Sequence, residues 1–522
     1  MNTTTMDEAE EDLFSKSPIL GLASLFVWTL FMDENQIAYA EVLVGDHMEI
    51  MPIEGGKFKR FLKAQYYSVF KDLCSSKELN TAIDIIAAYA QFDGDGTIKL
   101  HNRITWCNDS IHYDSADHTC WAVRVGREGW YIDRQPPILF RRYLNQVPQV
   151  MPSTRGNIRR FVDFLNVQDK NEILLIVVWI VTAFIPGFPH VILNIFGPHG
   201  SAKSTFCKML KMLIDPGIKL TDSLPRSQTA LIKRLYNSWL TIFDNLGTLT
   251  SLASDTLCRC VTGDGHAERK LRTNNEEVIY EFQHLIILNS INQVATQPDI
   301  RDRSLTLKLD RIGSQNRKPE KQLLQEFKEA LPEILGGIFD ILSKAMSLYS
   351  KAEEALTGSL PRMADFAIWG FAISEALGVP GSEFMKAYRD NIEYQNFVVI
   401  FDNPVAHTLI KFMDKRSTWY GSPHVLLAAL NAIAMDFDVK SKDWPQEGRA
   451  LTRKLNVLQA NLLESGIAIE TGIHRSKGNT ISIKNLHLND ARDDQHDGSS
   501  RPNQEKEVKI SASQPRLLHM NS

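Results

Sequence analysis

Cysteine is scarce in this sequence, and neither sign of charge is in clear excess. Six Cys in a chain of 522 residues exclude a disulfide framework, so reduced thiols in a cytoplasmic protein are the simpler expectation. Lys and Arg total 58 against 62 for Asp and Glu, which gives a formal charge of -4. A chain that is basic throughout, as a histone-like protein is, is therefore excluded. Any contact with nucleic acid must come from a local basic cluster.

The sequence also lacks a long unbroken hydrophobic run. The longest uncharged stretch, residues 173–196, is interrupted by Pro186, Gly187 and Pro189. Its part before Pro186 is shorter than the roughly 20 residues that a bilayer span needs. A second apolar stretch, residues 18–32, follows an acidic segment, whereas a secretory signal begins with positive charge. We therefore expect no membrane contact, and we interpret residues 173–196 as a buried helix, a turn and a buried strand.

The composition and the changes in residue pattern along the chain predict several globular parts. Hydrophobic residues make up 43% and charged residues 23% of the chain, close to ordinary soluble proteins, and no repeat of fixed period is visible. Changes in pattern divide the chain into an N-terminal α+β module of unknown role (1–150), an α/β core (151–318), a helical lid region (319–403), a winged-helix-like region (404–485) and a polar tail expected to be disordered (486–522).

Alternating apolar runs predict the secondary structure of the first two parts. Residues 97–133 contain four short alternating segments separated by turn residues, which indicate a strand-rich module. In the core, helical patterns alternate with apolar runs of the length of strands that are buried on both faces. Those runs are residues 191–196, 238–244 and 284–290. This order is typical of an α/β fold with a parallel sheet.

A phosphate-binding motif directly follows the first of these strands and precedes a helix. It reads Gly197, Pro198, His199, Gly200, Ser201, Ala202, Lys203, Ser204 and Thr205, which is close to the Walker A pattern in the context that the pattern requires. Backbone N–H groups of such a loop surround phosphate oxygens. Lys203 would reach the β and γ phosphates of ATP, and the Ser204 hydroxyl would bind Mg²⁺.

The motif departs from the usual pattern at Ala202, which stands where glycine is expected before the lysine. If this residue must adopt a positive φ, alanine costs about 1–2 kcal/mol, and if φ is negative the cost is small. A glycine-rich turn in an α/β domain is the alternative interpretation of the motif. Nucleotide binding is the interpretation that the strand and helix on either side favour.

Polar residues follow the next two strands. Asp244 ends the second strand and is our candidate to hold the metal-bound water, unless it is only a surface residue at the strand end. Asn245 stands where many ATPases place a catalytic Glu, and because Asn cannot accept a proton, Asp244 or another carboxylate must do so. Asn289 ends the third strand and could sense the γ-phosphate.

Arg303, next to a further apolar run, is our candidate arginine finger, with a salt bridge to Asp299 or Asp302 as the alternative.

These motifs resemble a known family. GPHGSAKST, TIFDN, ILNSIN and DIRDRS look like the AAA+ modules of superfamily 3 helicases, especially the primase-associated, poxvirus-type NTPases of viruses and mobile elements. Longer segments between about Phe140 and Trp369 are similar to an uncharacterised family of predicted prokaryotic ATPases. The resemblance implies an AAA+ P-loop ATPase core, a homo-oligomer that could be a hexameric ring, and movement along DNA.

The resemblance also implies a DNA-binding hairpin before the third strand. Before the third strand, a segment with three cations is followed by a polar turn and then by alternating apolar and polar residues. The candidate DNA-binding residues are the three cations, Arg269, Lys270 and Arg272. Their contacts with phosphates would be independent of sequence and sensitive to salt. The alternative is a solvated loop whose cations pair with Glu276 and Glu277. In the C-terminal region, a charged surface is the default interpretation of Arg449, Arg453, Lys454, Arg475 and Lys477.

The sequence therefore predicts a DNA-dependent ATPase of helicase type, with ATP and Mg²⁺ as cofactors, acting in the replication of a virus, plasmid or mobile element. A nucleotide-gated DNA-binding module with little turnover and a protein-remodelling AAA+ ATPase are the alternatives. A zinc site is disfavoured, because its candidate residues lack a tight C-x2-C pair. Those residues are His101, Cys107, His112, His118 and Cys120.

Overall fold

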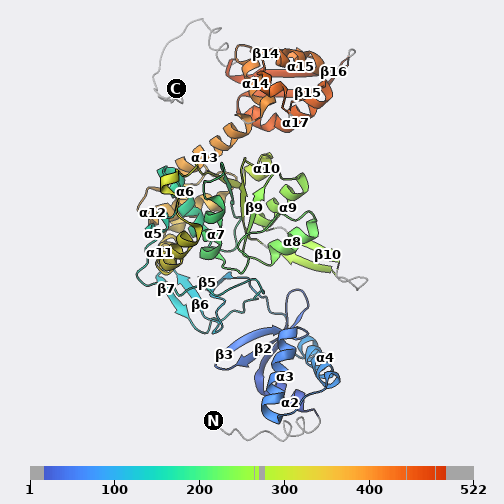
Figure 1. The fold of residues 1–522 in the computed structure, drawn as a ribbon, viewed down its shortest axis with the longest axis vertical. Coiled ribbons are helices and arrows are strands. Elements are labelled where there is room, and N and C mark those ends of the chain that lie inside the picture. The colour runs from blue at the N-terminus through green and yellow to red at the C-terminus, as the bar shows by residue number, and fades with distance from the viewer. Residues whose placement is uncertain are drawn as a thin grey trace. The chain divides into compact units, whose positions relative to one another are not determined.

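The computed structural model describes residues 17–488 apart from residues 264, 270–276, 282, 402, 442–443 and 476–477. It consists of two compact units, Met1–Val399 and Ile400–Ser522. Figure 1 labels the elements and colours them from the N-terminus to the C-terminus. Most of the tail predicted to be disordered, residues 489–522, lies outside the described residues.

The first unit begins with a small α+β layer. Its antiparallel sheet has the order β1-β2-β3, and three helices pack against it around a separate hydrophobic cluster. Helix α4 begins with a capping box, in which the Ser75 hydroxyl accepts from the Glu78 N–H and the Glu78 carboxylate accepts from the Ser75 N–H. The elements are α2 (Pro18–Phe26), β1 (Val27–Met32), β2 (Ala38–Val44), β3 (His47–Pro52), α3 (Gly56–Phe70) and α4 (Ser76–Phe92).

An antiparallel sheet follows, and it confirms the four predicted strands. Its order is β4-β5-β6-β7, with β4 (Ile104–Cys107), β5 (Ser110–Asp114), β6 (Ala122–Gly126) and β7 (Gly129–Asp133). Residues of one face, such as Ile111 and Val123, belong to the same hydrophobic cluster as the helices that cover the central sheet. The hydrophobic core therefore continues across residue 150, where the sequence pattern changes.

The central sheet is parallel, as predicted, and has the order β13-β8-β12-β9. Alternate residues of its strands enter two different clusters: Leu193 and Ile195 face α6, α7 and α11 (Glu320–Ala355), whereas Ile192 faces the side of α8 and α9. The sheet therefore lies between two helical layers. Its elements are α5 (Arg159–Val162), α6 (Lys170–Thr182), β8 (Ile192–Phe196), α7 (Lys203–Ile214), α8 (Gln228–Tyr236), β9 (Leu240–Leu246), α9 (Ser251–Thr262), β12 (Leu285–Ser290), α10 (Pro298–Arg301) and β13 (Ser304–Lys308).

The apolar stretch from residue 173 to 196 forms a buried helix, a turn and a buried strand, as expected. Helix α6 is buried from Leu175 to Thr182, and every residue of β8 is buried. Among the described residues, no helix combines the length and apolar character needed to cross a membrane.

A helical region completes the first unit. It contains η1 (Ser314–Asn316), α11 (Glu320–Ala355), α12 (Ala364–Ala376) and α13 (Gly381–Phe401), whose last turn reaches the unit boundary. Helix α11 has two adjacent glycines, Gly336 and Gly337, where the backbone of residues 153–158 approaches closely. A Cβ atom on Gly336 would lie 1.9 Å from the Ser153 carbonyl oxygen. The glycines therefore let this segment pack directly on the helix backbone.

The second unit has the order helix, strand, three helices and hairpin. Its elements are α14 (Pro404–Met413), β14 (Thr418–Gly421), α15 (Pro423–Asn431), α16 (Asp436–Val439), α17 (Gly448–Glu464), β15 (Ile467–Arg475) and β16 (Gly478–Asn485). The sheet is antiparallel with the order β14-β16-β15. Strands β15 and β16 form a hairpin inside the region that the sequence predicts to be winged-helix-like. Leu455 and Ile483 belong to a hydrophobic cluster that is made within this unit.

Candidate functional site

The glycine-containing loop connects the carboxyl end of β8 to the first turn of α7. Ala202 is the residue before the helix and has a φ of 61° and a ψ of 21°, which is the left-handed conformation. Ala202 therefore has the positive φ. For an alanine this conformation costs about 1–2 kcal/mol relative to ordinary helical backbone. Gly197 has a φ of 150°, and a Cβ atom there would lie 2.1 Å from the Leu309 carbonyl oxygen. Only glycine fits at that position without moving the segment after β13.

Lys203 lies at the first position of α7, and its side chain folds over the loop. Its Nζ donates to the carbonyl oxygens of Gly197 at 2.7 Å and Pro198 at 2.9 Å, and to the Ser201 hydroxyl at 3.3 Å. Partial burial lowers the pKa of Lys203, while the charge of Asp244 acts in the opposite direction. The ammonium group is thus held inside the curve of the loop, where several oxygen atoms surround it.

The structure brings three predicted residues together beside Lys203. The Ser204 hydroxyl donates to the Asp244 Oδ1 atom at 3.2 Å, and the Asn289 amide donates to the same Oδ1 at 2.6 Å and to the Ser204 Oγ at 3.3 Å. Asp244 belongs to β9 and Asn289 to β12, which are parallel neighbours. Both residues therefore meet at the carboxyl edge of the sheet, where open α/β sheets hold their ligands.

Asn245 has a backbone role that sequence reasoning did not foresee. Its φ is 57°, and its N–H donates to the Asp244 Oδ1 at 2.7 Å. The pairing of β12 with β9 shifts register at this point, between Leu288 and Ser290. Asn tolerates the left-handed conformation better than most residues, so the irregularity itself gives a reason for Asn at this position. Its catalytic role stays a prediction.

The segment after β13 adds residues that the sequence analysis missed. The Ile312 N–H donates to the Gly200 carbonyl at 3.1 Å, and the Arg317 Nη2 atom would lie 3.0 Å from a Cβ on Gly200. The Asn166 amide donates to the carbonyl oxygens of Asp310 at 2.7 Å and Ser201 at 3.4 Å. No motif marks these residues, which lie far from the loop in sequence. The only signal for Arg317 is a Lys- and Arg-containing stretch after an apolar run, and Asn166, which precedes the loop, has no such signal.

Arg303 forms the ion pair that the sequence analysis gave as its alternative. Its Nη1 atom contacts the Asp299 carboxylate and donates to the Asp299 carbonyl at 3.0 Å. Arg362 also contacts Asp299, at 2.6 Å, and reaches Asp302 at 2.9 Å. Within this single chain, Arg303 is thus held beside α10. Its role as a finger toward a neighbouring subunit stays a prediction.

The predicted hairpin before β12 is present. Strands β10 (Gly265–Arg269) and β11 (Glu277–Glu281) pair antiparallel, with Arg269 opposite Glu277. Lys270 and Arg272, together with the turn, lie outside the described residues. The backbone part of the prediction is therefore confirmed, and DNA contact by these three cations stays a prediction.

Four of the five cations considered in the second unit lie on its described elements. Arg449, Arg453 and Lys454 lie on α17, and Arg475 is the last residue of β15, whereas Lys477 lies outside the described residues. The residues considered for zinc do not gather. Among the described residues, no group of three or more His, Cys, Asp or Glu side chains could hold a metal ion.

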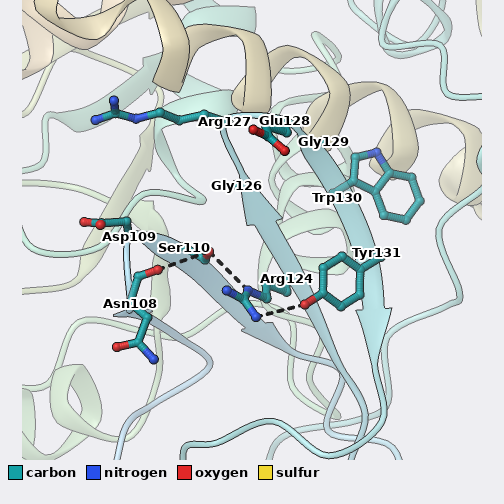
Figure 2. Close-up of a pocket in the computed structure, with 10 residues that line it drawn as sticks. All are labelled: Asn108, Asp109, Ser110, Arg124, Gly126, Arg127, Glu128, Gly129, Trp130 and Tyr131. Carbon is teal, nitrogen blue, oxygen red and sulfur yellow. Dashed lines mark hydrogen bonds between the residues drawn. The ribbon is translucent and has the colours of Figure 1, made fainter.

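A hollow of about 630 Å³ lies at the hairpin tips of the β4–β7 sheet (Figure 2). Arg124 crosses its floor, donating to the Tyr131 hydroxyl at 2.9 Å and to the Ser110 hydroxyl at 3.1 Å. The hollow shares no residue with the Gly197–Thr205 loop. Its lining includes two arginine residues, Arg124 and Arg127, and two aromatic residues, Trp130 and Tyr131, and we assign it no role.

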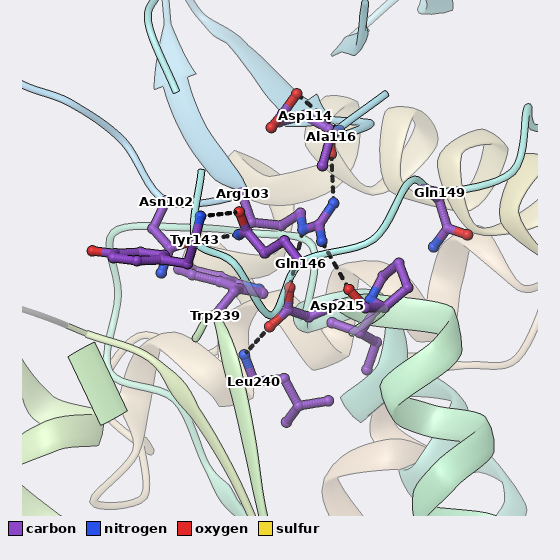
Figure 3. A network of polar contacts seen from close by, with 12 residues as sticks. Asn102, Arg103, Asp114, Ala116, Tyr143, Gln146, Gln149, Asp215, Trp239 and Leu240 are labelled. Atoms are coloured by element: carbon purple, nitrogen blue, oxygen red, sulfur yellow. Dashed lines mark hydrogen bonds and ion pairs between the residues drawn. The ribbon is translucent and has the colours of Figure 1, made fainter. Parts of the chain in front are cut away.

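A buried charge network joins the β4–β7 sheet to the end of α7 (Figure 3). The Asp215 carboxylate pairs with the Arg103 guanidinium at 3.0 Å and the Lys211 ammonium at 2.7 Å, and the side chains of all three are at most 5% exposed. It also accepts from the Leu240 N–H at 3.1 Å. Helix α7, which begins at the loop, is thereby tied at its other end to β9 and to the β4–β7 sheet.

Two family models match the chain. The model described as an actinomycete integrative conjugative element replication protein matches residues 158–396. The model described as the AICE RepA C-terminal domain matches residues 405–499. These matches support a replication protein of a mobile element. No curated protein matches the chain.

Two solved structures illustrate a distant resemblance to the chain. The A form apo structure of the NrS-1 C-terminal region aligns with 10% identity and a TM-score of 0.40, over 88% of this chain and 96% of the other. The apo structure of NrS-1 residues 305–718 aligns with 12% identity and a TM-score of 0.39, over 92% and 100%. Similarity at this level leaves fold and function to be argued from the chain itself.

Proposed function

We propose that this replication protein is an ATP-dependent, helicase-like DNA motor whose nucleotide site is the Gly197–Thr205 loop. The observation that carries the proposal is the meeting of Ser204, Asp244 and Asn289 beside Lys203, at the first turn of α7. A lysine, a hydroxyl and a strand-end carboxylate in this order are the protein groups that P-loop NTPases use on a triphosphate and its metal. The first turn of α7 adds N–H groups that favour an anion.

The residues present fit Mg²⁺ as the metal. Ser204 Oγ and the Asp244 carboxylate supply oxygen atoms, the ligand type that Mg²⁺ prefers. The Asn289 Oδ1 atom is buried and has no hydrogen-bond partner among the described residues, so the site contains an unused acceptor. Ser204 and Asp244 would hold the ion. When bound, it would neutralise charge on the phosphate oxygens.

The chain's own residues provide binding, orientation and a proton acceptor. In the proposed reaction, Lys203 exchanges the Gly197 and Pro198 carbonyl oxygens for phosphate oxygens. The Asn289 amide, which now donates to Asp244, is placed to orient the attacking water. Asn245 cannot accept a proton, so Asp244, which the Asn289 amide contacts, is our candidate proton acceptor. Arg317 adds positive charge beside Gly200, which favours a triphosphate further.

DNA contact and oligomerisation are further parts of the proposal. The β10–β11 hairpin would meet the DNA backbone through Arg269, Lys270 and Arg272, and Arg303 would reach the nucleotide of a neighbouring subunit in a ring. For Arg303 this requires its ion pair with Asp299 to open. Arg362, which also contacts Asp299, would keep that carboxylate paired after the exchange.

A nucleotide-gated DNA-binding module with little turnover is the second candidate. Two observations favour it: Lys203 is bonded to its own loop, and the residue after Asp244 is the left-handed Asn245 rather than a carboxylate. A protein-remodelling ATPase that ignores DNA is the third, and no contact among the described residues favours it.

Steady-state ATP hydrolysis with and without single-stranded DNA tests the proposal. Stimulation by DNA is expected for the motor, binding without turnover for the gated module, and indifference to DNA for the remodelling enzyme. Lys203→Ala should abolish hydrolysis. Lys208→Ala, on the same helix as Lys203, removes an ion pair with Glu320 of α11 and should leave hydrolysis unchanged. Hydrolysis at the parent rate by the Lys203→Ala protein would refute the nucleotide site.

A further inference from the structure

Helix α3 carries charge of one sign only. The segment from residue 55 to 71 contains five Lys and Arg residues and no Asp or Glu, in a chain whose formal charge is -4. Such a local basic cluster is what an acidic chain needs in order to hold a polyanion. Neither the family models, which begin at residue 158, nor the predicted motifs reach this helix.

The charges gather on the side of α3 that faces solvent. Phe58 and Leu62 are 0% and 1% exposed and anchor the helix in its module. Residues three, four and seven apart share a helix face, and the exposed face opposite these anchors contains Arg60, Lys63, Tyr67, Phe70 and Lys71. We call this set the α3 face.

Two aromatic rings lie among these cations. Tyr67 is 56% exposed and Phe70 is 40% exposed. The Lys71 Nζ atom lies 5.9 Å from the centre of the Tyr67 ring, and the Phe70 ring is 4.8 Å from that of Tyr66. The rings are therefore supported from one side by neighbours on the same helix, and their outer sides are accessible.

Two cations of the α3 face, Arg60 and Lys63, are not used in ion pairs within the described part of the module. Lys57 contacts Glu49 and Lys59 reaches Asn80, so these two already have partners. Arg60 and Lys63 form no ion pair within the part of the chain that the structure describes. The charge of these two residues is thus available to an outside anion along about one turn of helix.

We propose that the α3 face binds single-stranded DNA, with its cations on the phosphates and a base stacked on Tyr67. Interleaved cations and exposed rings are the combination that holds single strands without regard to sequence. An accessible ring also favours a single strand over duplex, because only unpaired bases can leave their stack. The proposal rests on the replication role that the family matches support and is independent of ATP hydrolysis.

Fluorescence anisotropy of the full chain with a labelled oligothymidylate, measured without nucleotide at several salt concentrations, tests the proposal. Tyr67→Ala should weaken binding by about 5-fold to 150-fold, the equivalent of one lost stacked base, and Tyr67→Phe should retain parent affinity. Arg60→Glu and Lys63→Glu should each lower the salt slope by about 0.7, the loss expected for one phosphate contact on a single strand. Lys328→Glu, the same charge change at an exposed site on α11, should leave affinity and slope unchanged.

Parent affinity and parent salt slope in all the α3 variants would overturn the proposal. Unchanged DNA binding together with a changed mass in light scattering would overturn it too and assign the face to a second copy of the chain. The variants also separate this proposal from the nucleotide site. They should hydrolyse ATP at the parent rate in the absence of DNA, while Lys203→Ala should bind the oligonucleotide with parent affinity under nucleotide-free conditions.

Discussion

Replacing Asp215 by Asn should destabilise the first unit strongly. The change keeps the shape of the side chain but removes the negative charge between Arg103 and Lys211, whose side chains are 0% and 5% exposed. Breaking a buried ion pair in this way costs about 3–5 kcal/mol, because an uncompensated charge stays buried. Here two cations lose their shared partner, and the Leu240 N–H loses a charged acceptor. We therefore expect the upper part of that range.

Urea unfolding followed by tryptophan fluorescence measures this loss, since Trp239 is buried in the same core. Glu320→Gln is the matched control: it is also a carboxylate-to-amide change, but its pair with Lys208 is exposed, so about 1 kcal/mol or less is expected. A loss below about 1 kcal/mol for Asp215→Asn would refute the reasoning and show that the network can be exchanged for neutral groups.

The pH dependence gives the same network a second test. Burial raises the pKa of Asp215, but the charges of Lys211 and Arg103 outweigh it and lower the pKa to about 2. A carboxyl with a lowered pKa adds stability above its ordinary value of 3.8, and that stability is lost as pH falls toward 2. The difference between the free energies of unfolding of the parent and Asp215→Asn should therefore be constant above about pH 5 and shrink below it.

Three further substitutions test local features. Ala202→Gly should retain the loop and raise stability by up to about 1 kcal/mol in thermal unfolding, because Gly adopts the left-handed conformation without strain; a clear loss would contradict the φ of 61°. Gly336→Ala should cost about 1–3 kcal/mol, since its Cβ would meet the Ser153 carbonyl, whereas helix propensity alone predicts a gain. Burial and the neighbouring Asp169 and Asp310 raise the pKa of Glu172 to about 7, so its ionisation opposes folding as pH rises from about 4.5 to 7. Glu172→Gln should then raise the melting temperature at pH 8 more than at pH 5, and an equal change at both would contradict this assignment.

Local patterns predicted the elements well, because strand and helix periodicity are properties of neighbouring residues. The strand-loop-helix around Lys203 and the parallel sheet are examples, and the convergence of Asp244 and Asn289 follows from the parallel arrangement. Contacts between distant segments had no such signal. Nothing in the sequence around Arg103 indicates that its partner lies 112 positions away.

Backbone conformation is the second feature that could not be predicted from the sequence. The cost of Ala202 depended on a φ that residue types alone leave open, and the structure places it in the left-handed region. The sequence analysis considered only the catalytic chemistry of Asn245. The structure gives this residue a φ of 57°, which suits the irregularity in its strand. The sequence pattern did not indicate the α3 face, because its cations are interspersed with apolar residues and come together on one side only when the helix forms.

Isothermal titration calorimetry with ATP and Mg²⁺ tests the central claim most directly. The account predicts saturable heat for the parent protein and for Lys208→Ala, and none for Lys203→Ala or Gly197→Ala. A parent protein that yields no heat, or a Lys203→Ala protein that binds as the parent does, would contradict it.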